Sequence, residues 1–174
     1  MSLELSLFNS AFNSALATKQ AAREIMRCND FTALHGLTLT EQQSLELVET
    51  RNQSLRDSGR IEIGGGVTRR LIYEFCDSPY ISMQNYAETL HELTELFYYF
   101  KTETNDLISD DDLISYMKNS FDNVCQGSLD MLAGTELDRM ARNLRNGHEP
   151  DYEEPEDDGE SGEDGFMAGL TFYE

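Results

Sequence analysis

The chain has 174 residues, enough for one domain with a buried core, and its 13 basic and 33 acidic side chains give a formal net charge of −20. Residues 148–174 hold eleven of the acidic side chains and no Lys or Arg, which leaves a net charge of −9 on residues 1–147. Without a basic patch, direct binding to nucleic acid or to an anionic membrane surface is disfavoured.

The first 16 residues have an ambiguous pattern. Leu3, Leu5 and Leu7 alternate like a short strand, whereas the apolar residues that follow recur at helical spacing. Good helix formers favour a helix from about Asn13 onward. This segment has no basic region typical of a secretory signal, and no apolar run near the centre is long enough to cross a membrane, so we expect a cytoplasmic protein.

A second helix is predicted from Thr40 to about residue 57. Thr40 and Gln43 form a capping box, and Gly59 is placed to end the helix. Its apolar seam contains Asn52, which needs a polar partner if it is buried. The next segment begins with Ile61 and Ile63, which could form a short extended piece before a helix that ends near residue 76.

The clearest helical signal runs over residues 82–103, with Ser82 as the predicted cap. Apolar residues at a 3-4-3-4-3 spacing form one seam, and four residues occupy the opposite face: Glu88, Glu92, Glu95 and Tyr99. Two further helices follow, one capped by Ser109 and one by Thr135. The sequence therefore predicts an all-α fold of six or seven helices around residues 82–103, with at most a short strand pair near residues 61–63.

The composition changes at His148. Residues 148–165 are acidic and contain Pro and Gly, which predicts a disordered linker after a helical domain of residues 1–147. The last residues, FMAGLTFYE, are apolar and aromatic again.

The central part of the chain resembles a known family. The similarity rests on the strings LTLTEQQSLELVETRNQSLRDSGRIEIGGGV, YAETLHELTELFYYFKTET, ISDDDLISYMKNSF and GSLDML, within about residues 37–145. These strings resemble a family of small cytoplasmic Firmicutes proteins that is catalogued as a domain of unknown function. The resemblance implies a compact helical domain in a bacterial cytoplasm, and it implies no activity, substrate or cofactor.

A glycine-rich turn is the first candidate for chemistry. Gly64, Gly65 and Gly66 precede a helix that carries Arg69 and Arg70, so backbone N–H groups and two cations could hold a phosphate. The chain has no dinucleotide-binding or P-loop pattern, and the simpler interpretation is a tight turn between two helices.

Two acidic motifs offer weaker metal candidates. Glu88, His91 and Glu95 could contribute half of a two-metal site, but the chain has no second such motif, and a solvated helix face explains them as well. The acidic triplet at residues 110–112 lacks the spacing of a calcium loop and is better explained as a helix start.

No local signature of a nucleophilic enzyme is present. Cys28, Cys76 and Cys125 are far apart and indicate reduced thiols, and no cofactor is predicted. The last segment has the form of a docking peptide for a partner protein or for its own domain, through these residues: Phe166, Met167, Leu170, Phe172 and Tyr173.

These observations favour a non-enzymatic module that binds another protein. The alternatives are a small enzyme or an anion- or nucleotide-binding domain that uses the Gly64–Arg70 turn, and an acidic mimic of nucleic acid. The sequence does not define the oligomeric state, although an exposed apolar groove would favour a homodimer.

Overall fold

The computed structural model describes residues 2–150, and this range is helical without any strand. The predicted all-α class is therefore confirmed, and residues 61–63 form no strand pair. Six helices have eight residues or more: α1 (Ser2–Arg27), α3 (Glu41–Ser58), α4 (Gly66–Phe75), α5 (Tyr86–Glu103), α6 (Asp110–Asn119) and α8 (Asp138–Arg145). Two short helices are α2 (Asn29–Thr32) and α7 (Leu129–Met131).

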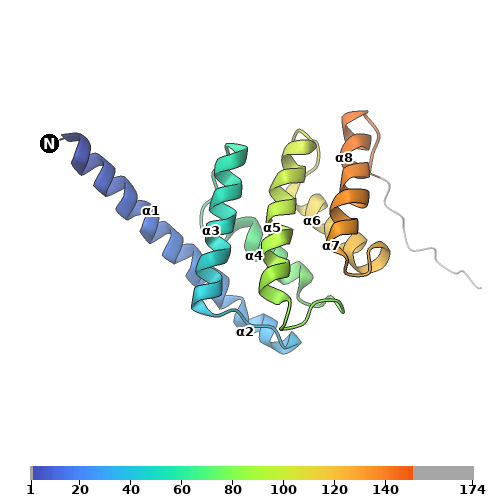
Figure 1. The fold of residues 1–174 in the computed structure, drawn as a ribbon, viewed down its shortest axis with the longest axis horizontal. Helices are drawn as coiled ribbons and strands as arrows, with labels where there is room; N and C mark the ends of the chain where they lie inside the picture. The colour runs from blue at the N-terminus through green and yellow to red at the C-terminus, as the bar shows by residue number, and fades with distance from the viewer. Residues whose placement is uncertain (1, 151–174) are drawn as a thin grey trace, which may run out of the picture.

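Helix α5 is the centre of the bundle, as its apolar seam predicted. It contacts α3, α4, α6, α7 and α8, and Figure 1 shows it between α3 and α8, with α4 and α6 behind this layer. Leu90, Leu93 and Phe97 on its inner face are almost completely buried. Removing each of these side chains from water stabilises the folded state by about 2 kcal/mol. This gain explains why the other helices pack around α5.

The start of α5 differs from the prediction. The helix begins at Tyr86, and Ser82 lies in the preceding turn, where its N–H donates to Asn85 Oδ1 at 2.8 Å. Met83, predicted in the buried seam, is 48% exposed. The Asn85 side chain organises this turn by bonding to Ser82, so the helix starts one turn later than its apolar pattern suggested.

Helix α3 has the predicted ends but a different buried polar residue. Gln43 N–H donates to Thr40 Oγ1 at 3.1 Å, Thr40 N–H donates to Gln43 Oε1 at 2.9 Å, and Gly59 closes the helix at φ +66°. Asn52 is half-buried, whereas its neighbour Arg51 is only 4% exposed. Arg51 is therefore the buried charged residue of this helix, and Ser44 is buried as well.

Helix α1 begins at Ser2, so the strand interpretation of the first residues was wrong. Its second half packs on the bundle through Ala21, Ala22 and Ile25, which are buried mainly against α3. The residues from 9 to 17 are exposed, and Figure 1 shows this half extending beyond the other helices. A strand would have found no partner there, while a helix satisfies its backbone internally.

The last helical region also differs from the prediction. Ser109 caps α6 as expected, since it accepts a hydrogen bond from Asp112 N–H at 3.1 Å. Thr135, however, caps no helix, because it lies within a π-helical turn, Leu132–Leu137, that joins α7 to α8. This continuous helical path places α7 and α8 against α5.

Candidate functional site

The glycine-rich turn before α4 wraps around two carboxylates of the chain itself. Gly65 N–H donates to Glu24 Oε2 at 2.7 Å, and Val67 N–H donates to Glu62 Oε1 at 2.6 Å. Gly64 and Gly66 have φ of +68° and +49°, and a Cβ atom on either would collide with one of these carboxylates. Glycine is required here by both the backbone conformation and the close approach.

The positively charged residues around this turn, including the predicted Arg69 and Arg70, also have partners within the chain. The Arg51 guanidinium donates to the carbonyl of Gly64. Arg69 lies 5.6 Å from the centre of the Tyr73 ring, and Arg70 forms ion pairs with Asp110 and Asp111 at 3.3 and 2.5 Å. Two residues of the acidic triplet thus pair with Arg70. The anion site stays a prediction, and the backbone N–H groups of Gly65 and Val67 at the turn donate to carboxylates of the chain itself.

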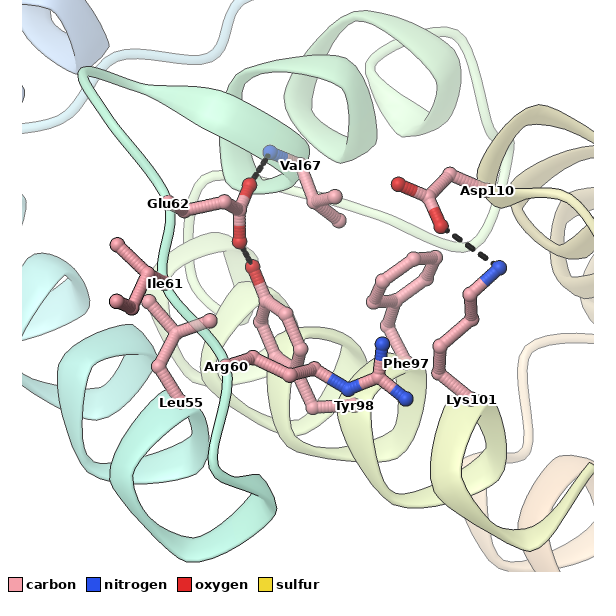
Figure 2. A pocket seen from close by; sticks show the side chains of 9 residues that line it. All are labelled: Leu55, Arg60, Ile61, Glu62, Val67, Phe97, Tyr98, Lys101 and Asp110. Carbon is pink, nitrogen blue, oxygen red and sulfur yellow. Dashed lines mark hydrogen bonds and ion pairs between the residues drawn. The ribbon is translucent and has the colours of Figure 1, made fainter. Parts of the chain in front are cut away.

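A small cavity of about 240 Å³ lies beside the turn (Figure 2). Three of its polar side chains have partners in the cavity wall: Tyr98 donates to Glu62, and Lys101 donates to the Ile108 carbonyl and pairs with Asp110 at 2.8 Å. Burial raises the pKa of the Glu62 carboxyl. No Cys, Ser, Thr or His among the described residues lines the cavity, and its Lys101 and Asp110 side chains are engaged with one another.

The predicted metal residues lie on the outer face of α5. His91 Nδ1 is 2.7 Å from Thr50 Oγ1 of α3, while Glu88 and Glu95 are exposed. Within residues 2–150, no group of three or more His, Cys, Asp or Glu side chains is placed to hold a metal ion. The Thr50–His91 contact was missed from the sequence, because 41 residues separate the two and no local motif marks them.

The three cysteines are buried and unpaired with one another. Burial raises the pKa of each thiol, Cys28, Cys76 and Cys125, so the thiols are protonated at neutral pH. A protonated, buried thiol is a poor nucleophile and a poor metal ligand.

Two hollows meet at Tyr99 on the exposed face of α5, and we call them together the Tyr99 groove. The hollow between α3 and α5 has a volume of about 370 Å³ and is lined by Thr50, Gln53, Ser54, Asp57, Ser58, Glu95, Tyr98, Tyr99, Thr102 and Glu103. The hollow between α5 and α7 has a volume of about 290 Å³ and is lined by Glu92, Glu95, Leu96, Tyr99, Leu129, Asp130 and Ala133. Tyr99 and Glu95 belong to both, and the Tyr99 side chain is 58% exposed.

The Tyr99 groove carries negative charge that the described part of the chain does not neutralise. Neither hollow is lined by Lys or Arg. Of the five carboxylates, Glu103 pairs with Arg145 at 3.1 Å, and the other four form no ion pair with residues 2–150. Partial burial raises the pKa of Glu92, and the negative charges of Glu88, Asp130 and Glu95 raise it further. The groove is therefore suited to a positively charged group.

The fold and this groove define a helical domain with an acidic, aromatic surface. The chain belongs to the family described as "Family of unknown function (DUF6323)", whose model covers residues 24–150. This confirms the resemblance to a domain of unknown function, over a slightly longer range than the sequence strings indicated. No curated protein and no solved structure matches the chain.

Two further predictions concern membrane-spanning helices and the docking residues of the last segment. No helix of residues 2–150 has the length and apolar character needed to cross a membrane. The docking residues predicted in the last segment, Phe166, Met167, Leu170, Phe172 and Tyr173, lie outside the described residues.

Proposed function

We propose that this protein is a non-enzymatic interaction module of the bacterial cytoplasm that binds a positively charged segment of a partner protein in the Tyr99 groove. The observation that supports this proposal best is the set of carboxylates without ion pairs around the exposed Tyr99 ring. A Lys or Arg side chain in the hollow between α5 and α7 would neutralise Glu92 and Glu95, whose like charges repel one another. An arginine could also stack on the Tyr99 ring.

The dimensions of the groove favour an extended or helical peptide over a single small molecule. The two hollows share Tyr99 and Glu95, so a peptide laid across α5 would fill both and place successive cations near separate carboxylates. Exposed aromatic residues that remain in place when a partner arrives contribute strongly to binding at such surfaces.

A catalytic function has less support from the same geometry. The Thr50–His91 pair is the nearest candidate for a nucleophile and base, and no carboxylate within residues 2–150 bonds to the imidazole to orient it. The anion-binding alternative depends on the N–H groups of Gly65 and Val67, which donate to Glu24 and Glu62. Both alternatives would require existing contacts to break before a ligand could bind.

The test is a selection from a random peptide display library with the full-length protein as bait. We expect the selected peptides to be rich in Lys and Arg, and their affinity to fall as salt is raised, because exposed charges are screened. Fluorescence anisotropy should then show at least a roughly tenfold loss of affinity in the double variant Glu92→Gln/Glu95→Gln, about 1.4 kcal/mol.

The matched control changes two carboxylates on the solvent side of α3, Glu46→Gln/Glu49→Gln, which alters the net charge by the same amount. We expect this control to keep its affinity within about twofold, since exposed charges outside a contact contribute little. Selected peptides without an excess of Lys and Arg, or an equal loss in both double variants, would overturn the proposal.

A further inference from the structure

The short segment between α3 and α4 exposes its apolar residues and directs its acidic residue inward, which is the opposite of what water favours for an isolated domain. Ile61 and Ile63 are 93% and 92% exposed, while Glu62 between them points inward to Val67 and Tyr98. Figure 2 shows the Glu62 carboxylate directed to Val67 and Tyr98. Two neighbouring aliphatic side chains in water indicate a surface that another segment covers.

The backbone of this segment is also available for pairing. The segment belongs to no helix, and the N–H and C=O groups of Ile61 and Glu62 take no part in the hydrogen bonds formed by the described residues. A segment with free backbone groups can accept an added strand, in which backbone bonds provide affinity and alternate side chains provide specificity.

The hollow beside Ile61 has an excess of positive charge. It has a volume of about 240 Å³ between α1 and α3, and its ionisable residues are Arg51, Arg56, Arg60 and Glu62. Arg56 pairs with Glu49 and Arg60 pairs with Asp106, and both are pairs of partly exposed side chains. Such pairs contribute about 0–1 kcal/mol, so these guanidinium groups can exchange partners readily.

The C-terminal part of the chain begins at the same end of the bundle. Arg145, at the end of α8, donates to the carbonyl of Glu103 at 2.9 Å, and Arg60 pairs with Asp106 at 2.8 Å. The ends of α8 and α3 therefore flank the same end of α5, separated by about 20 Å at two helix spacings. Residues 151–165 can span up to about 50 Å, so the linker is long enough to bring the last segment to Ile61.

We propose that residues 166–174 of the same chain dock along Arg60–Ile63, in a site separate from the Tyr99 groove. Phe166, Leu170 and Phe172 cover Ile61 and Ile63, and the backbone of this segment pairs with that of Ile61 and Glu62. The carboxylate of Glu174 binds the guanidinium groups of Arg56 and Arg60. Apolar side chains and one carboxylate are both present in residues 166–174, which matches the two isoleucines beside the arginine-lined hollow.

Charge and connectivity favour the same chain over a second copy. Two chains of net charge −20 repel one another, whereas a segment of the same chain is held near its own domain at an effective concentration in the millimolar range. The docked segment would bury the exposed isoleucines without bringing two acidic domains together.

The protein contains no tryptophan, so Phe172→Trp in the full-length chain creates a single fluorescent reporter on the face of the docking segment that covers the isoleucines. We expect its emission to lie at shorter wavelength than in guanidinium chloride, and to be independent of protein concentration. In the same background, Ile61→Asp/Ile63→Asp should move the emission to the wavelength of the unfolded chain. Since both isoleucines are exposed, circular dichroism should show the same helical content.

The matched control replaces two other exposed apolar residues, Leu34→Asp/Met131→Asp, and should leave the emission unchanged. The proposal is overturned if the native emission equals that of the unfolded chain, or if the isoleucine variant keeps the short-wavelength emission. A shift that develops only as protein concentration rises would assign the site to a second copy and overturn docking within one chain. These outcomes do not depend on the Tyr99 groove, because neither variant changes a residue that lines it.

Discussion

The turn before α4 and the Tyr99 groove both gather carboxylates, but only the turn provides them with partners. At the turn, Glu24 and Glu62 accept hydrogen bonds from Gly65 and Val67. In the groove, Glu92 and Glu95 face other negative charges, and no Lys or Arg from the described part of the chain lines it. Carboxylates that cap backbone N–H groups stabilise the fold, whereas carboxylates that repel one another on an open surface destabilise it slightly. The difference distinguishes a structural cluster from a surface that gains free energy when a cation binds.

The largest expected effect comes from breaking the turn. Gly66→Ala would place a Cβ atom against the Glu62 carboxylate at a residue with φ +49°. The backbone strain and the lost cap of Val67 together should lower the free energy of unfolding by about 2–4 kcal/mol. Urea denaturation measures this change directly.

The control for the turn is Gly134→Ala. Gly134 has no unusual φ and no atom within 4 Å of an added Cβ, so its substitution should change the free energy of unfolding by less than about 0.5 kcal/mol. Equal effects at the two glycines would mean that the turn tolerates a side chain and that Glu62 is not held tightly within it.

A second prediction uses the buried acid of the turn. Because burial raises the pKa of Glu62 above its ordinary value of 4.5, the folded state holds this proton more tightly than the unfolded state. Its contribution to stability is therefore lost as pH rises through the interval between the unfolded and folded pKa values. Glu62→Gln removes this loss, so its free energy of unfolding should increase relative to the wild type as pH rises above 4.5.

The change in that difference is at most about 1.4 kcal/mol per pH unit within the interval. It should level off once Glu62 is ionised in both states of the wild type. Comparing the two proteins at each pH cancels the titration of the remaining groups. A difference that is flat from pH 4 to pH 8 would show that the surroundings of Glu62, including Arg51, fully compensate its burial.

The sequence predicted the helices well and the charge partners poorly. The seam of α5, the capping box at Thr40 and the caps at Ser109 and Gly59 are local patterns, since each depends on residues within a few positions of one another. Asn52 was expected to be the buried polar residue of α3, but Arg51 takes that place because Gly64, thirteen residues later, accepts its hydrogen bond. The contact depends on how α3 and the turn pack, which no helical periodicity encodes.

The same limit explains the candidate sites. The Gly64–Gly66 turn was found from its composition, yet the Glu24 carboxylate that it encloses is 41 residues away from Gly65. The outer face of α5, with Glu92, Glu95 and Tyr99, was correctly predicted to be exposed. This face forms a groove because α3 and α7 pack on either side of it. That arrangement belongs to the tertiary structure and is not encoded in a local pattern.

The smallest expected effect concerns single carboxylates on the surface. Glu92→Gln should raise the free energy of unfolding by about 0.3–0.5 kcal/mol, because it removes the cost of partly burying a charge and the repulsion by neighbouring carboxylates, at a site where solvent screens most of the interaction. Asp77 is the matched comparison, since a hydrogen bond from Lys118 lowers its pKa and the two side chains pair at 2.6 Å. Asp77→Asn should lower the free energy of unfolding by a similar amount.

Opposite signs of these two effects, each reduced by added salt, would show that the groove holds uncompensated charge. The pH dependences should differ as well. The contribution of Asp77 is lost as pH falls through its lowered pKa, whereas the cost of Glu92 develops as pH rises above 4.5. If Glu92→Gln destabilised the protein instead, this carboxylate would have a favourable partner within its own chain. A cation from another protein would then have no repulsion to relieve, and the argument for a positively charged ligand in the Tyr99 groove would fail at its first step.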